Sequence, residues 1–272
     1  MTSARAGGSI ALLLCASALA SGCSGCEGSR REVGSLPDLG YPTCDGAPLP
    51  DGEVIASAVL RSGPVMREQN VVEELELRRR GCVVSARLHQ EWPLGTSDVE
   101  VLYDEALLPL RAYKRTTMPD ASGPLGHLDV RLYELRTDPV GLTRRTPRGE
   151  LERFELLGGR PRAVIAPGRG VLTVWLRRAA LAEGGRVRET VLDVREPIAV
   201  LREVTLERLE DREVEGLGRV RVYTIFGREP IFADGDDVVI GDMFGLRRAD
   251  AVPGPIPDPM PDLPPLDATA PP

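Results

Sequence analysis

The chain has 272 residues, of which 42% are hydrophobic and 28% charged, and its formal net charge is -7. This composition is globular and excludes collagen-like and coiled-coil chains, and the length suits one large domain or two small ones. The acidic balance argues against nucleic-acid binding, because such proteins draw much of their affinity from Lys and Arg at phosphates. Lys114 is the single lysine and the arginines are scattered, which fits coding bias better than a guanidinium-based function.

The N-terminal residues have the organisation of an export signal. Arg5 and the free amine give a positive start, and residues 10–20 form an apolar run. The run is too short for a transmembrane helix, which needs ~20 apolar residues, and it matches the apolar region of a signal peptide. It ends in the sequence Leu19-Ala20-Ser21-Gly22-Cys23.

Small residues directly before a cysteine resemble the lipobox of bacterial lipoproteins, although Ala20 stands where that family more often has leucine. The resemblance implies that residues 1-22 are a signal peptide, cut before Cys23, and that Cys23 carries a diacylglyceryl thioether and an acyl chain such as palmitate. Ser24 stands where the family's inner-membrane members have Asp, so the resemblance favours the outer membrane. We therefore expect a lipid-anchored protein of the bacterial cell envelope that faces the periplasm. An ordinary secretory signal cut near Ala20 is the alternative.

Five cysteines are present, of which Cys15 would leave with the signal and Cys23 would carry lipid. An exported chain meets an oxidising compartment, where disulfides persist. Cys44 and Cys82 flank folded-looking sequence, so we expect them to pair and Cys26 to stay unpaired. A Cys26–Cys44 pair is the alternative, because sequence alone does not determine connectivity.

Composition divides the mature chain into three parts. Residues 23-43 are rich in Gly, Ser and Pro and predict a lipidated flexible tether. Residues 44-250 predict one β-rich globular domain. Residues 251-272 are Pro-rich and predict an extended, disordered tail, since proline continues neither helices nor central strands.

Alternation of apolar and polar residues predicts mostly strands within the globular domain. Two such runs flank Arg80-Gly81 and predict a hairpin, and Val99–Tyr103 and Leu110–Arg115 predict another. Between Leu132 and Tyr133 the apolar phase shifts by one residue, which predicts a β-bulge. Residues 219–223 should pair with residues 203–207 across a turn at 215–218.

One stretch has helical spacing instead. Its apolar stripe lies on one side and Arg177 and Arg178 on the other, with the stripe formed by Val171, Leu172, Trp175, Leu176, Ala179 and Ala180. We predict one helix of about three turns, preceded by Gly168 and Gly170 and ended by Gly184-Gly185. It would cover the apolar face of the sheet, with Trp175 in the core; a ligand contact at Trp175 is the alternative.

The residues offer little chemistry. His89 falls on the polar face of its strand and His127 in a loop, and no common catalytic or nucleotide-binding motif is present. The cysteine pattern gives no zinc site. Residues Asp234–Asp237 favour a hairpin turn over a calcium site, because the EF-hand spacing fails. Residues Gly168–Gly170 could hold an anion on backbone N–H groups, or be a plain connection. We therefore expect no catalytic residue, cofactor or metal.

The folded region loosely resembles periplasmic antiparallel half-barrel proteins, of the lipoprotein-carrier type or of an uncharacterised exported family. The similar features are Tyr103-Asp104 at a strand end, Leu108–Arg111, and late strands around Gly241–Leu246. The resemblance is architectural and assigns no functional residue. It implies a mainly β fold: a curled antiparallel sheet or half-barrel with one short helix packed on it.

The expected function is that of a non-enzymatic envelope lipoprotein that binds an apolar or amphipathic ligand on the concave sheet face. One alternative is a structural or assembly lipoprotein whose tail and edge strands contact other envelope proteins. The other is an uncharacterised enzyme that uses its carboxylates.

Overall fold

The computed structural model describes residue 44 and residues 50–62, 70–118, 127–145, 151–195 and 199–249. The predicted signal peptide, the whole tether with Cys23 and Cys26, and the Pro-rich tail lie outside these ranges. The boundaries predicted for these parts therefore stay predictions.

The first half of the domain is a meander in which each strand is antiparallel to the next. Its strands are β1 (Glu53–Ser62), β2 (Val72–Arg80), β3 (Val83–Trp92), β4 (Gly95–Tyr103), β5 (Pro109–Met118), β6 (His127–Glu134), β7 (Val140–Arg145) and β8 (Leu151–Leu156). The predicted hairpins are confirmed: β2 and β3 join through Gly81 and Cys82, and β4 and β5 through a short connection.

The second half contains the helix and the remaining strands. In chain order these are β9 (Ala163–Ile165), the 3-10 turn η2 (Arg169–Val171), α1 (Leu172–Ala179), β10 (Arg186–Asp193), β11 (Val200–Arg208), β12 (Arg212–Val214), β13 (Gly218–Ile225), β14 (Glu229–Ala233), β15 (Val239–Asp242) and β16 (Leu246–Arg248). Pairing of β1 with β16 joins the two halves into one sheet.

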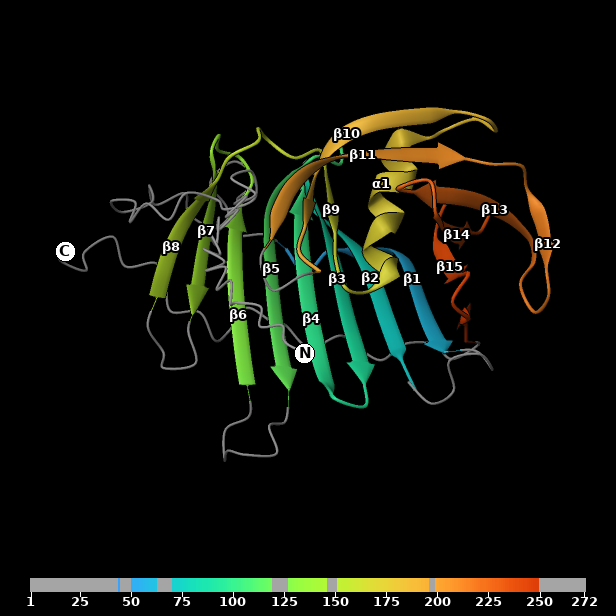
Figure 1. Cartoon of the computed structure of the whole chain (residues 1–272), viewed down its shortest axis with the longest axis horizontal. Helices are drawn as coiled ribbons and strands as arrows, with labels where there is room; N and C mark the ends of the chain where they lie inside the picture. Colours follow the sequence, from blue (N-terminus) through green and yellow to red (C-terminus); the bar gives the residue numbers. More distant parts are fainter. Residues whose placement is uncertain are drawn as a thin grey trace, which may run out of the picture.

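The sheet is open and curled, with β8 at one end and β9 at the other (Figure 1). Its order is β8-β7-β6-β5-β4-β3-β2-β1-β16-β15-β14-β13-β11-β10-β9, and β12 pairs with β13. Only the β9–β10 pair is parallel among the described strands. The predicted fold class, a curled antiparallel sheet with one short helix, is confirmed.

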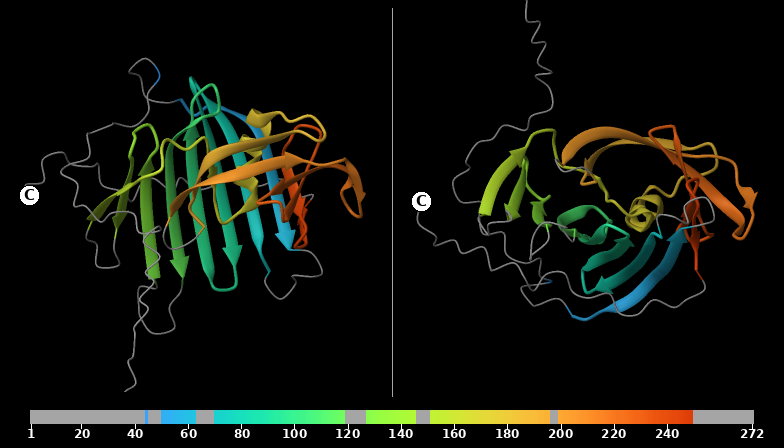
Figure 2. Two further views of the ribbon diagram at one scale, coloured as in Figure 1. Left: turned by 45° about the horizontal axis from the view of Figure 1, so that its top comes forward. Right: turned by 60° about the horizontal axis from the view of Figure 1, so that its bottom comes forward.

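Helix α1 lies inside the curve, between the strands β1–β4 and the strands β10 and β11 (Figure 2). Its apolar side is buried in the same core as the inward residues of β2 and β3, such as Leu75, Leu77 and Leu88. Trp175 is 2% exposed and belongs to this core, as predicted. Burial of the stripe explains why an eight-residue helix is stable here, since a helix this short is marginal alone.

Three local predictions were wrong. The helix ends at Ala179, because Ala180 takes a left-handed conformation with φ 42°, and does not reach Gly184-Gly185. The register of β6 is continuous and contains no bulge. Residues 130–135 are all buried, so apolar residues occur on both faces of this strand without any change of register. The turn at 215–217 joins β13 to β12, while β11 pairs with residues 223–225 of β13.

Candidate functional site

A cavity of about 440 Å³ opens at the end of the domain where α1 and β2 both finish. Its apolar wall comes from the inner faces of the first strands, the β4–β5 connection and the helix, with Ile55, Leu77, Val83, Val84, Leu107 and Val174. Its charged lining residues are Arg79, Glu105 and Arg177. The cavity therefore combines an apolar interior with two guanidinium groups and one carboxylate.

The two arginines differ in their hydrogen-bond partners. Arg177 Nε donates a hydrogen bond to the backbone oxygen of Asp236, at 3.0 Å. Arg79 is exposed, and its guanidinium makes no hydrogen bond or ion pair with any described residue. It follows Leu75 and Leu77 in the inward phase of β2, so the alternation that predicted this strand also placed a charge on its inner face. The alternation thus pointed to Arg79, which was not among the predicted site residues.

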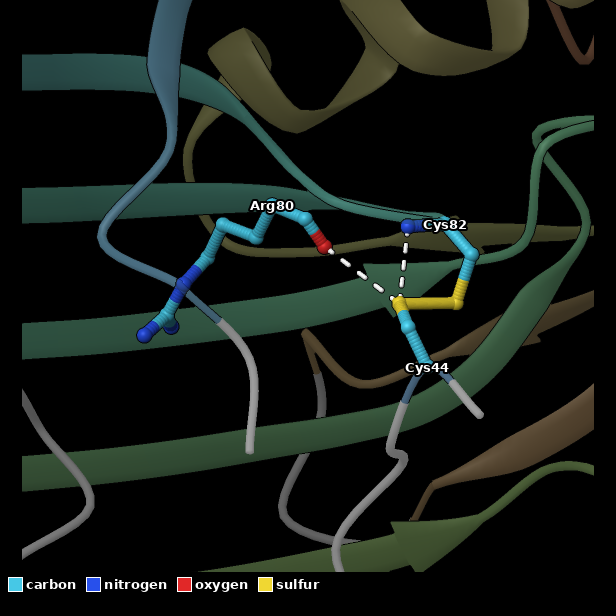
Figure 3. Close-up of a disulfide and its surroundings, with 3 residues drawn as sticks. All are labelled: Cys44, Arg80 and Cys82. Atoms are coloured by element: carbon cyan, nitrogen blue, oxygen red, sulfur yellow. Dashed lines mark hydrogen bonds between the residues drawn. A yellow bond between two sulfur atoms is a disulfide. The ribbon is translucent and has the colours of Figure 1, made fainter. Parts of the chain in front are cut away.

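The disulfide between Cys44 and Cys82 lies beside the cavity, which Cys82 and Gly81 help to line (Figure 3). The predicted pairing of these two cysteines is therefore present. The backbone N–H of Cys82 points to Cys44 Sγ at 2.8 Å. Gly81 has a φ of 64°, and a Cβ at this position would lie 2.9 Å from Cys44 Sγ, so the hairpin needs glycine here.

At the opposite end of α1, the carboxyl of Glu73 is buried and meets the start of the helix. Its Oε2 accepts hydrogen bonds from the backbone N–H groups of Arg169 (2.8 Å) and Gly170 (3.4 Å). Its Oε1 accepts one from Gln90 Nε2, at 3.1 Å. Burial raises the pKa of Glu73 to about 7, although the hydrogen bonds from Arg169 and Gly170 favour the ionised form.

The backbone N–H groups at 169–170, considered in the sequence as an anion site or a plain connection, thus bind the protein's own carboxyl group. Gly168 allows the approach, because a Cβ there would lie 2.2 Å from Cδ2 of Leu88. The side chain of Arg169 turns away to Glu229, at 2.7 Å, and to Asp242, at 3.5 Å. This end of the helix is an internal anchor and gives no evidence of an external ligand.

Trp175 is held by a second buried carboxylate, that of Glu189. Trp175 Nε1 donates to Glu189 Oε2 at 2.7 Å, and Arg178 and Arg162 pair with the same carboxylate. Burial opposes ionisation of Glu189, but the hydrogen bonds from Arg178, Trp175 and Arg162 hold its pKa below the usual range. Because its indole is buried and hydrogen-bonded within the core, Trp175 is not one of the cavity-lining residues.

The acidic loop at 234–237 forms the predicted hairpin turn between β14 and β15. Asp234 Oδ1 accepts the N–H groups of Asp236 and Val238, at 2.9 and 3.0 Å. Arg221 Nη1 lies 2.8 Å from Asp237 Oδ1. Across the described ranges, no group of three or more His, Cys, Asp or Glu side chains is arranged to hold a metal ion.

The two histidines lie on different strands, His89 in β3 and His127 in β6. His89 lies in β3, with Nδ1 2.6 Å from Asp98 Oδ1 and Nε2 3.2 Å from Glu91 Oε1. The hydrogen bond to Asp98 is the main cause that raises the pKa of His89 to about 9. His127 begins β6, so the prediction that it lies in a loop was wrong.

Known proteins show only distant similarity to this chain. No family model matches the chain, and no curated protein matches it. A crystal structure of a DUF1089 family protein from Pseudomonas aeruginosa aligns at 16% identity over 65% of this chain and 92% of that chain, with a TM-score of 0.43. A β-barrel-like protein of the domain of unknown function DUF1849 from Brucella abortus aligns at 9% identity over 72% and 97%, with a TM-score of 0.42. Within the described residues, no helix has the length and apolar character to span a bilayer.

Proposed function

We propose that this protein is a non-enzymatic, lipid-anchored envelope protein that holds a small amphipathic ligand in the cavity between α1 and strands β1–β3. The observation that carries the proposal is the composition of the cavity: an apolar wall and, among its lining residues, an Arg79 guanidinium that pairs with no described residue. Binding sites for small molecules are typically apolar cavities of ~300–1,000 Å³ with a few placed polar groups. The volume of about 440 Å³ falls within that range.

The position of the helix restricts what kind of ligand fits. Because α1 covers the inner face of β2 and β3, a long lipid has no open sheet face there to lie along. A ligand with a short apolar body would contact Leu77 and Val174 and reach the guanidinium of Arg79 with an acidic head. Arginine suits such a head, since its planar fork binds carboxylate and phosphate groups in a bidentate manner.

Neighbouring residues on opposite faces of one strand provide a direct test. Ile55 lines the cavity, whereas Val54 is 44% exposed and is not part of the cavity lining. The full-length protein, purified in detergent, is extracted with organic solvent and the extract is examined by mass spectrometry. We expect one amphipathic species to accompany the wild type and Val54→Trp and to be lost from Ile55→Trp. If the wild type yields no such species, ligand carriage is refuted.

The charge of the ligand is tested by a second matched pair. Arg79→Gln should lower the amount of bound ligand, whereas Arg78→Gln should not, because Arg78 pairs with Glu76 at 2.9 Å and is not a cavity residue. Equal loss of ligand in both variants would contradict recognition by Arg79.

The lipid anchor is proposed from the resemblance at Cys23 and is tested independently of the cavity. The intact mass of the mature protein should begin at Cys23 and include a diacylglyceryl group and an acyl chain. Cys23→Ala should remove that added mass and release the chain from the membrane fraction. A Cys23→Ala protein that still fractionates with membranes would contradict the anchor.

A further inference from the structure

Strand β8 forms one end of the sheet and leaves an edge open. It pairs with β7 along one side, and along its other side it pairs with no strand of the described chain (Figure 1). The strand at the other end of the sheet, β9, is three residues long and fully buried. An open edge presents unpaired backbone N–H and C=O groups, which can pair with an added strand.

Opposite charges flank Phe154 in β8, where the order is Glu152, Arg153, Phe154, Glu155, Leu156. Neither Arg153 nor Glu155 forms an ion pair with a described residue, and Arg153 Nε is buried with no hydrogen-bond partner in that part of the chain. Across β7, Glu155 stands opposite Gly141, which has no side chain to contact it. Two opposite charges on one face of an edge strand therefore have no ion-pair partner among the residues that the structure describes.

Symmetry restricts how β8 could pair with a second β8. In an antiparallel pair, opposing residues lie on the same side of the sheet, so a two-fold axis must set one residue opposite its own copy. An axis at Glu152, Arg153 or Glu155 would set like charges face to face, which is destabilising. An axis at Leu151 or Leu156 would lie at an end of β8 and leave most of the strand unpaired. An axis at Phe154 sets Phe154 opposite Phe154 and sets Arg153 opposite Glu155 twice.

We propose that β8 is a self-association edge, which joins two copies of this chain as an antiparallel β8–β8 pair centred on Phe154. Both Arg153–Glu155 pairs then lie on the outer face. The two Phe154 rings meet on the inner face, where Phe154 already packs against the core. Aromatic pairs and opposite charges are the cross-strand combinations that favour antiparallel pairing.

A charge-exchange cycle tests the register. The full-length protein in detergent is examined by sedimentation equilibrium, with circular dichroism as the check on folding. Arg153→Glu and Glu155→Arg each set like charges together and should raise the dimer dissociation constant at least about tenfold. The double variant restores opposite charges and should return the constant to within about threefold of the wild type. Arg212→Glu, at an exposed site on β12 that makes no ion pair with a described residue, controls for charge reversal alone.

Cross-linking gives an independent measurement. Phe154→Cys would face its own copy and form a disulfide between chains, above the wild-type background. Arg153→Cys would lie diagonally from its own copy, beyond the reach of a disulfide. The proposal is overturned if the wild type is monomeric, or if the double charge exchange fails to restore association. None of these outcomes depends on the ligand cavity.

Discussion

The buried carboxyl of Glu73 makes the stability of this fold depend on pH in a direction opposite to that of most acidic residues. Burial raises its pKa from the ordinary 4.5 to about 7. The folded state therefore keeps a proton that the unfolded chain has already released between these two values. Stability should fall as the pH rises through this window, because ionisation inside the core lacks the solvation available in water.

The magnitude follows from the two pKa values. One unit corresponds to about 1.36 kcal/mol, so the full difference amounts to about 3 kcal/mol, and most of it develops between pH 5 and pH 8. Glu73→Gln removes the ionisation. Its amide oxygen can still accept from the N–H groups of Arg169 and Gly170, and its amide NH₂ can donate to a reoriented Gln90. Asp242 and the Arg169 guanidinium, the charged groups near Glu73, are unchanged.

The assay is urea unfolding of wild type and Glu73→Gln across pH 5 to 8, followed by circular dichroism. We expect the variant to gain about 2–3 kcal/mol relative to the wild type as the pH rises from 5 to 8. Glu53→Gln, at the exposed start of β1, controls for the loss of one carboxyl group. If the difference between wild type and Glu73→Gln is the same at every pH, Glu73 does not titrate in this range and the reasoning is refuted.

Three further predictions follow from described contacts. The hydrogen bond to Asp98 is the main cause that raises the pKa of His89 to about 9, so its imidazole should titrate near pH 9 by NMR. The stabilisation that protonated His89 contributes is complete below pH 6.5 and should be lost as the pH rises through about 9. A titration near pH 6.5 would contradict the contact. Trp175→Phe deletes the buried donor to Glu189 and should cost about 1–3 kcal/mol in denaturant unfolding, whereas an unchanged midpoint would show that the hydrogen bond is absent. Replacing both Cys44 and Cys82 by serine opens a loop with a separation of 38 residues and should cost about 4 kcal/mol, with reduction of the wild type giving the same loss.

The hairpins were predictable because their signals are local. Alternation over a few residues, with Arg80-Gly81 between two runs, specifies both the strands and the turn. The Cys44–Cys82 pair was also predicted, since only three cysteines remain once Cys15 and Cys23 are assigned. In each case a short stretch of sequence, or the small number of remaining cysteines, leaves few alternative structures.

The features that were missed depend on residues far apart in the chain. Nothing near Glu73 indicates that its carboxyl meets Arg169, 96 residues later. The supposed bulge in β6 arose from reading two buried faces as a change of phase, which a single strand does not distinguish. The end of α1 at Ala180 was hidden because alanine is a strong helix former and seldom takes a left-handed conformation. Tertiary packing decided each of these points.

The disulfide at the cavity also determines where a mechanical load enters the domain. If Cys23 carries a lipid anchor, a pull on that anchor would reach Cys44 and pass through the disulfide to Cys82 and the β2–β3 turn. The load would then enter the domain beside the cavity, because Gly81 and Cys82 of that turn are lining residues.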